Sequence, residues 1–148
     1  MKNSLKILGL IVLVILLIAI REVVAPYLYD PLANYFKSDY LYKPVPYINL
    51  GLLLANIFVR YILNTAVSIG IIYVLFKDVK LVWFALKIYV IAFIFFSLCL
   101  IAILKFNQEN NYLLLFYVRR FLIHPILVLL LIPAFYFQKL KSSKNLNN

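Results

Sequence analysis

The sequence predicts an all-α membrane protein with four transmembrane helices, both termini in the cytoplasm, and one longer Tyr/Pro-rich extracytoplasmic loop between helices 1 and 2. Three features lead to this prediction. Of the 148 residues, 66% are hydrophobic and the mean hydropathy is +1.00, whereas an ordinary soluble domain is about half apolar. Four apolar runs are each long enough for the roughly 20 residues that a helix needs to cross a bilayer. Basic residues gather at alternate ends of these runs, as in multi-pass proteins.

The four apolar runs, which are the primary signal for secondary structure, cover residues 5–24, 48–76, 81–104 and 112–137. The fourth contains Pro125 and Pro133, which should bend the helix, because neighbouring helices can satisfy the carbonyls that a proline frees. We expect residues 1–139 to form a single four-helix transmembrane domain. The polar residues 140–148 are expected to be a disordered cytoplasmic tail.

Orientation follows from the basic residues that flank the spans. With the N-terminus inside, the cytoplasmic side collects seven lysines: Lys2, Lys6, Lys77, Lys80, Lys139, Lys141 and Lys144. The opposite side collects four basic residues: Arg21, Lys37, Lys43 and Lys105. The chain is therefore predicted to have both termini in the cytoplasm, and its net charge of +10 indicates topology and anionic lipid rather than nucleic acid.

The connection between the first and second spans, residues 21–47, is the only long loop. It holds four prolines, six tyrosines and three of the five acidic residues, Glu22, Asp30 and Asp39. We expect it to lie along the outer membrane–water boundary as short turns with one interfacial helix over residues 31–37.

Polar residues recur along one face of the second span. Asn56, Arg60, Asn64 and Ser68 follow one another every four residues, and Asn49 lies seven residues before Asn56. This spacing places them on one slowly drifting helix face. At about 1.5 Å of rise per residue, Arg60 lies roughly 18 Å below the outer end of its span.

The fourth span carries a second polar group. Tyr117, Arg120 and His124 are spaced by three and four residues, which indicates one helix face, and Arg119 lies beside them. The two arginines lie roughly 10 to 12 Å below the outer end of their span. All three intramembrane arginines are thus expected in the outer half of the membrane or near its middle.

Charge at this depth needs a partner, because an isolated arginine at the membrane centre costs roughly 2.5 to 3.5 kcal/mol on insertion scales. The spans hold no central Asp or Glu, so the partner must be a helix carbonyl, a lipid phosphate, an anionic ligand, another protein or an acid of the outer loops. The loop acids are Glu22, Asp30, Asp39 and Glu109. Three interpretations stay open: a structural clamp whose outer arginines reach the headgroups, a polar cavity for an anionic group, or a fourth span that lies shallower than expected. The candidate binding residues are Asn56, Arg60, Asn64, Arg119, Arg120 and His124.

An enzymatic site has one set of candidates. Cys99 lies roughly 8 Å below the outer end of the third span, and Cys99, His124 and Arg120 could supply a thiolate nucleophile, its base and an oxyanion stabiliser. However, "FSLCLIA" is an apolar context in which a lone cysteine is usually inert. The phosphate-binding, HExxH and CxxC patterns are absent. We expect no cofactor and no metal, and a proton-coupled transporter would want an intramembrane carboxylate.

The stretches "DYLYKPVPYINLGLLLANIFVRYILNTAVSIGIIYVLFKD" and "YLLLFYVRRFLIHPILVLLLIPAFYFQK" resemble the exosortase F system-associated membrane proteins, four-span bacterial chains of about this length encoded beside an exosortase. The likeness covers nearly the whole chain. Its most specific parts are the "RYxLN" core with Arg60, Tyr61 and Asn64, and the "YVRRFLIHP" to "PAFYFQK" run. The resemblance implies a role in or beside an envelope system in which exosortases process C-terminal tripartite sorting signals, and a place in the bacterial cytoplasmic (inner) membrane.

Exosortases use a membrane-embedded Cys, Arg and His, and Cys99, Arg120 and His124 occur in that order. The exosortase cysteine lies in a small-residue setting such as "CSG" or "CNG", whereas this chain has "LCL". We therefore expect a non-catalytic accessory protein that binds an anionic group or a partner helix. Its expected partners are membrane lipid and the neighbouring exosortase or its sorting-signal substrate, without nucleic acid. The alternatives are a minimal Cys-dependent exosortase-like peptidase or transpeptidase, and a small-molecule carrier.

Overall fold

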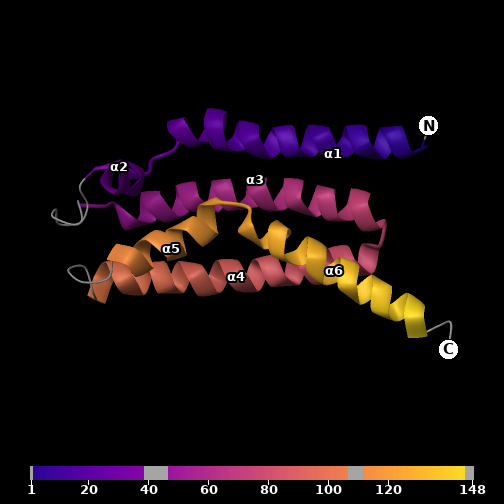
Figure 1. Cartoon of the computed structure of the whole chain (residues 1–148). Coiled ribbons are helices and arrows are strands. Elements are labelled where there is room, and N and C mark those ends of the chain that lie inside the picture. Colours follow the sequence, from indigo (N-terminus) through magenta and orange to yellow (C-terminus); the bar gives the residue numbers. More distant parts are fainter. Residues whose placement is uncertain (1, 39–46, 107–111, 146–148) are drawn as a thin grey trace.

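The computed structural model describes residues 2–38, 47–106 and 112–145, and over these residues the chain is all-helical, as predicted. The α-helices are α1 (Lys2–Ala19), α2 (Pro31–Lys37), α3 (Leu50–Phe76), α4 (Val79–Phe106), α5 (Tyr112–Ile123) and α6 (Ile126–Asn145). The bundle consists of four longer helices, α1, α3, α4 and α6, and two shorter ones, α2 and α5 (Figure 1). A π-helical turn, Ile20–Val24, and a 3₁₀ turn, Ala25–Tyr27, join α1 to the segment before α2.

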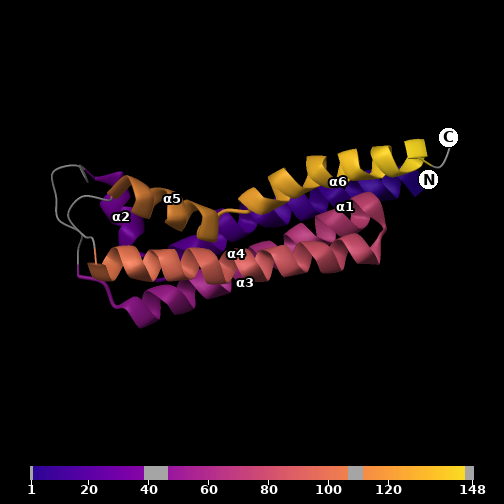
Figure 2. The same cartoon turned by 90° about the horizontal axis from the view of Figure 1, so that it is seen from below.

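Three helical segments are long and apolar enough to cross a membrane: Ser4–Val24, Leu50–Phe76 and Val79–Phe106. A fourth candidate consists of α5 and α6, which are bent by 67° at the break between them. Figures 1 and 2 show that α5 begins at the end of the bundle where α2 lies and that α6 finishes at the other end. By their length and composition, these helices of the described residues are consistent with a multi-pass membrane protein.

The break between α5 and α6 lies at Pro125, where the sequence predicts a bend within one helix. Pro125 has no N–H to donate, and its ring disfavours a helical conformation at the residue before it. The His124 N–H still bonds to the Arg120 carbonyl at 3.1 Å, whereas the Ile126 N–H turns back to the His124 carbonyl at 2.8 Å. Pro133, the other predicted bend, lies within α6 without breaking it.

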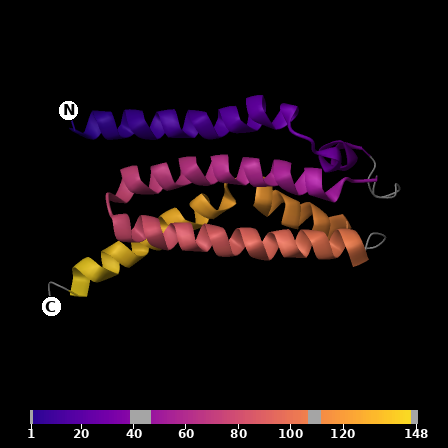
Figure 3. The same ribbon diagram turned by 180° about the vertical axis from the view of Figure 1, so that it is seen from behind.

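Helix α3 is the centre of the bundle, packing against α1, α4, α5 and α6. The Tyr61 hydroxyl donates a 2.7 Å hydrogen bond to the Tyr89 carbonyl and so ties α3 to α4. Helix α1 lies alongside α3 (Figure 3), at a place where a Cβ on Gly70 would come within 3.4 Å of Leu13. No residue of the most apolar part of α1 is buried, so this helix is the least enclosed of the spans.

The C-terminal end of α3 is held by lysines from both ends of the chain. Lys6 of α1 donates to the Leu75 carbonyl at 3.0 Å, and Lys139 of α6 donates to the Phe76 carbonyl at 3.3 Å. Cations at a helix C-terminus satisfy its last carbonyls and its dipole. These two contacts place both termini at the same end of the bundle, as Figures 1 and 3 show.

Two boundaries differ from the sequence-based expectation. The first span is not one α-helix over residues 5–24, because a π-helical turn occupies its last five residues. Helix α6 continues through Asn145, so residues 140–145 of the expected disordered tail are helical. Residues 140–145 begin with Leu140 and Lys141, which are good helix formers, and no Gly or Pro interrupts them. The expected short helix at residues 31–37 is confirmed as α2, whose Leu32 and Tyr35 are buried.

Candidate functional site

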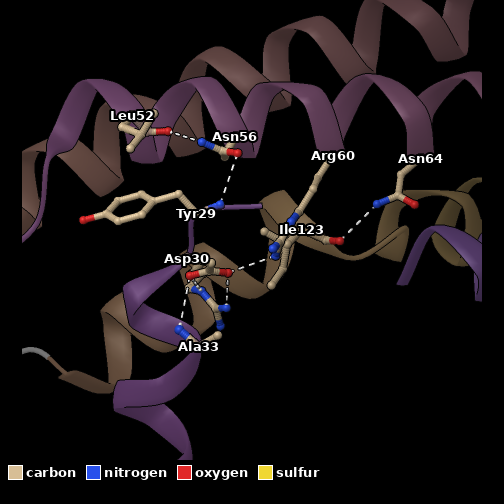
Figure 4. A network of polar contacts seen from close by, with 9 residues as sticks. Tyr29, Asp30, Ala33, Leu52, Asn56, Arg60, Asn64 and Ile123 are labelled. Atoms are coloured by element: carbon tan, nitrogen blue, oxygen red, sulfur yellow. Dashed lines mark hydrogen bonds and ion pairs between the residues drawn. The ribbon is translucent and has the colours of Figure 1, made fainter. Parts of the chain in front are cut away.

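The site begins with Asp30, which starts α2. Its carboxylate accepts a hydrogen bond from the Ala33 N–H at 3.2 Å, and Pro31 occupies the first helical position. Asp as N-cap with Pro at the first position is a favoured helix start, because the carboxylate satisfies an otherwise unpaired N–H and proline is preset for the helix. The Tyr29 N–H donates to the Asn56 side chain at 3.2 Å and fixes the preceding residue to α3 (Figure 4). The Asp30 carboxylate is thereby directed between α3 and α5.

Two arginines from different helices bind this single carboxylate. Arg60 of α3 donates through Nη1 to Oδ2 at 2.9 Å (Figure 4). Arg119 of α5 makes a two-point contact, with Nε to Oδ1 at 3.2 Å and Nη2 to Oδ2 at 2.5 Å. The three side chains are only 6% to 10% exposed. When all three are ionised, one negative and two positive groups give this cluster a net charge of +1.

The cluster identifies one partner of the buried arginines among the four loop acids that the sequence left open. Asp30 forms ion pairs with both Arg60 and Arg119, although it lies outside the spans. Glu22 instead pairs with its exposed neighbour Arg21 at 3.4 Å. The other two candidate acids, at positions 39 and 109, lie outside the described residues. The Asp30 carboxylate thus neutralises part of the positive charge of these two buried arginines.

Aromatic contacts hold α2 and α5 together around the ion cluster. The Arg119 guanidinium lies 5.9 Å from the centre of the Phe36 ring, and Phe36 packs edge-on against Phe116 at 5.2 Å. Burial, and to a smaller degree the neighbouring Tyr112, raises the pKa of the Tyr35 phenol on α2. Helix α2 is therefore an integral wall of the site.

Of the two adjacent arginines, only Arg119 is buried. It shares the inner face of α5 with Leu115, Val118 and Leu122, whereas Arg120 is exposed, with its guanidinium 6.0 Å from the Phe116 ring. Tyr117 is also exposed, so the face on which Tyr117 and Arg120 were expected is directed away from the core. Successive residues on a helix are about 100° apart, so one arginine of the pair must turn outward when the other faces the core.

A cavity of about 1070 Å³ opens beside the cluster, between the end of α1 with its π turn, α2, α3 and α5. Four of the six predicted binding residues line it: Arg60, Asn64, Arg119 and His124. Among the described residues of its wall, four are basic, Arg21, Lys37, Arg60 and Arg119, and two are acidic, Glu22 and Asp30. With His124 neutral the wall carries a net charge of +2. We call this cavity the cationic pocket.

The remaining polar residues shape the pocket. Asn64 donates to the Ile123 carbonyl at 3.0 Å, so it satisfies a carbonyl at the break between α5 and α6 (Figure 4). Asn56 lies outside the pocket wall and holds Tyr29, while its amide donates to the Leu52 carbonyl at 2.7 Å. The His124 imidazole, half-buried in the wall, forms no hydrogen bond with the described part of the chain.

The three residues of the catalytic alternative fall in different settings. Cys99 on α4 packs against the hydrophobic core and does not line the cationic pocket, Arg120 is exposed, and only His124 is in the pocket wall. Within residues 2–38, 47–106 and 112–145, no group of three or more His, Cys, Asp or Glu side chains could hold a metal ion.

Sequence reasoning named Asp30 only as one of several possible counterions and did not include it among the site residues. The signal that singles it out is local: Asp-Pro at the start of a predicted short helix is an N-cap arrangement, which fixes the direction of the carboxylate. Arg21 and Lys37, which also line the pocket, had been assigned only to the outer loop. Comparisons with family models, with curated proteins and with solved structures find no match to the chain.

Proposed function

We propose that this chain is a non-catalytic accessory protein of an exosortase-type protein-sorting system in the bacterial cytoplasmic membrane, and that its cationic pocket binds an anionic group. The association with sorting is what the resemblance of the sequence implies. The observation that carries the binding role is the charge of the pocket, where two guanidinium groups share one carboxylate. The described residues of the wall include four basic and two acidic side chains.

A charge excess in these surroundings favours an anionic ligand for an energetic reason. Buried charges are costly unless they are paired, and low local polarity strengthens the attraction of an opposite charge. Arginine also presents its donors as a planar fork that matches carboxylate and phosphate oxygens. The cavity volume of about 1070 Å³ is at the upper end of typical ligand sites, which measure roughly 300 to 1,000 Å³.

In this proposal both termini lie in the cytoplasm and the pocket opens in the outer half of the membrane. The distribution of lysines along the sequence supports that orientation. The contacts of Lys6 and Lys139 with the end of α3 support a common side for the two termini. The pocket would then face the side where the sorting signals of exported proteins are processed.

The test uses two adjacent arginines as a matched pair. In the native host, Arg119→Gln removes the excess charge while Asp30 keeps Arg60 as its partner, and Arg120→Gln removes an exposed charge outside the pocket. We expect Arg119→Gln to lower the sorting of a reporter with a C-terminal tripartite signal by about tenfold, equivalent to ~1.4 kcal/mol of binding. Arg120→Gln and Cys99→Ala should leave sorting unchanged. Membrane levels are compared by immunoblot.

Full reporter sorting by Arg119→Gln at normal membrane levels would overturn the role of the pocket. Loss of sorting with Cys99→Ala would instead favour the peptidase alternative. Co-purification of the wild-type chain with the neighbouring exosortase tests the association independently of the pocket.

A further inference from the structure

We propose that the ligand of the cationic pocket is a phosphate group carried by a lipid, with the phosphate beside Arg60 and Arg119 and the hydrocarbon chain along α1. This inference rests on the proposed function, since it names the chemical class of the anion that the pocket binds. It is carried by three features: the two kinds of wall, an uncovered apolar stripe that leads to them, and the arrangement of the cationic groups.

The pocket has a charged side and an apolar side. Arg60, Arg119 and His124 come from α3, α5 and the break after α5. Leu17, Ile18 and Ile20, from the end of α1 and its π turn, face the same cavity. A small soluble anion needs only the first side, whereas an amphiphile uses both, because each part of the ligand then meets surroundings of its own polarity.

The apolar side continues along α1 away from the pocket. Ile7, Ile11, Val14 and Ile18 are spaced by four, three and four residues, which places them on one helix face. They are 48% to 57% exposed, and other aliphatic residues of α1 such as Leu8 and Ile15 are exposed too, so this stripe differs from them in ending at the pocket. Ile18 belongs both to this stripe and to the pocket wall. A hydrocarbon chain that follows the stripe would therefore bring its head group to the pocket.

The cationic groups favour phosphate over carboxylate. Arg21, Lys37, Arg60 and Arg119 come from four different elements, namely the π turn, α2, α3 and α5. Donors that approach from several sides suit a tetrahedral group with three or four acceptor oxygens better than a planar carboxylate with two. A phosphate monoester brings about −1.5 to −2 charges, which matches the net +2 of the described pocket wall. A zwitterionic head group would place its own positive charge beside the cationic side chains of this wall.

The pocket extends inward from one end of the bundle. Arg60 is the tenth residue after the start of α3, about 15 Å along the helix, whereas α2, which ends at Lys37, lies at the end of the bundle where α3 begins (Figure 1). Lipid phosphates already lie at the membrane boundary, so a lipid needs only a short inward movement to meet Arg119 and Arg60. The π turn also fits this role, because single π turns occur often at functional sites.

The experiment measures binding to the purified full-length chain in detergent, by native mass spectrometry and by the shift of its thermal unfolding midpoint. The ligands are dioleoyl phosphatidic acid, dioleoyl phosphatidylcholine with the same chains, glycerol 3-phosphate and oleate. We expect phosphatidic acid to bind at least about tenfold more tightly than each of the others. Arg119→Gln should remove this preference, and Arg120→Gln should retain it.

The apolar stripe has its own matched pair. Val14 lies on the stripe, whereas Leu16 is exposed on a different face of α1. Val14→Asn should weaken phosphatidic acid binding several-fold and leave glycerol 3-phosphate binding unchanged, and Leu16→Asn should change neither. Because Val14 and Leu16 are both exposed, neither substitution removes a side chain that packs α1 against α3.

Each contrary result has a defined meaning. If glycerol 3-phosphate bound as tightly as phosphatidic acid, the proposal that a lipid carries the phosphate would be overturned. The ligand of the pocket would then be a soluble phosphate. Arg119-dependent binding of oleate or of an acidic peptide, without phosphatidic acid binding, would overturn the phosphate lipid and leave the anion pocket in place. Equal binding of the two dioleoyl lipids would overturn the inference. If no anion bound in an Arg119-dependent way, the pocket itself would fail.

Discussion

The carboxylate of Asp30 and the guanidinium of Arg119 form a two-point ion pair across 89 positions of sequence. Arg60 joins the same carboxylate from a third element of the fold. One acid outside the spans thereby fixes α2 to α3 and α5, while the excess of positive charge stays in the pocket wall. The stability of this end of the bundle and its capacity to bind an anion are consequently linked through Asp30.

Replacing the shared acid should destabilise the fold. Asp30→Asn leaves two buried guanidiniums without their carboxylate, and breaking a buried ion pair costs about 3 to 5 kcal/mol. We expect a lower thermal unfolding midpoint in detergent, partly restored by phosphatidic acid, because the net charge of the cluster rises from +1 to +2. The matched control is Asp78→Asn, where the carboxylate accepts an exposed 2.8 Å bond from the Lys80 N–H at the start of α4. Equal effects of the two substitutions would contradict the role of Asp30.

Arginine and lysine should not be interchangeable at position 119. Arg119→Lys keeps the charge but replaces a planar fork by a point charge, so the two-point contact with Asp30 is lost. A hydrogen bond to a charged group contributes about 1.5 to 3 kcal/mol, and we expect a loss of stability of that size. Arg120→Lys, at the exposed neighbour, should stay within about 0.5 kcal/mol. Denaturation in mixed micelles measures the free energy of unfolding of both variants. An unchanged stability of Arg119→Lys would contradict the two-point contact between Arg119 and Asp30.

Asn64 and Pro125 should be coupled. Asn64→Ala removes the donor that satisfies the Ile123 carbonyl at the break, and such membrane hydrogen bonds contribute about 0.6 to 1.7 kcal/mol. In a Pro125→Ala background the helix can continue, so that Ile123 regains an ordinary helical donor and Asn64 matters less. In a double-mutant cycle on thermal stability, Asn64→Ala should therefore cost less in the Pro125→Ala background than in the wild-type chain. Additive effects would mean that Asn64 does not act through the break.

The contact between α1 and α3 should depend on Gly70. A Cβ at this position would already lie 3.4 Å from Leu13, so Gly70→Leu should push α1 away and cost about 1 to 3 kcal/mol. Gly9→Leu is the matched control, because a Cβ there has nothing within 4 Å. Both substitutions raise helix propensity equally, so the difference between their unfolding midpoints isolates the packing term. Equal midpoints would show that α1 is not held at Gly70.

Several features could be predicted from the sequence because they depend on local chemistry. A short helix begins at Pro31 because Asp30 is a favourable N-cap and proline is favourable at the first helical position. Arg60, Asn64 and Ser68 share a buried face since four-residue spacing aligns them on a helix. The sequence predicts a bend at both Pro125 and Pro133, whereas of these two prolines only Pro125 breaks the helix.

The sequence alone determined an all-helical membrane chain with arginines inside its apolar spans, because length, hydropathy and proline placement act residue by residue. Only the tertiary structure decided that Arg119 rather than Arg120 faces inward, and that Asp30 pairs with it. Lipid-facing and core-facing residues are equally apolar, so hydrophobic periodicity does not reveal how a membrane helix is rotated. That rotation follows from packing between helices, and with it the composition of the cationic pocket.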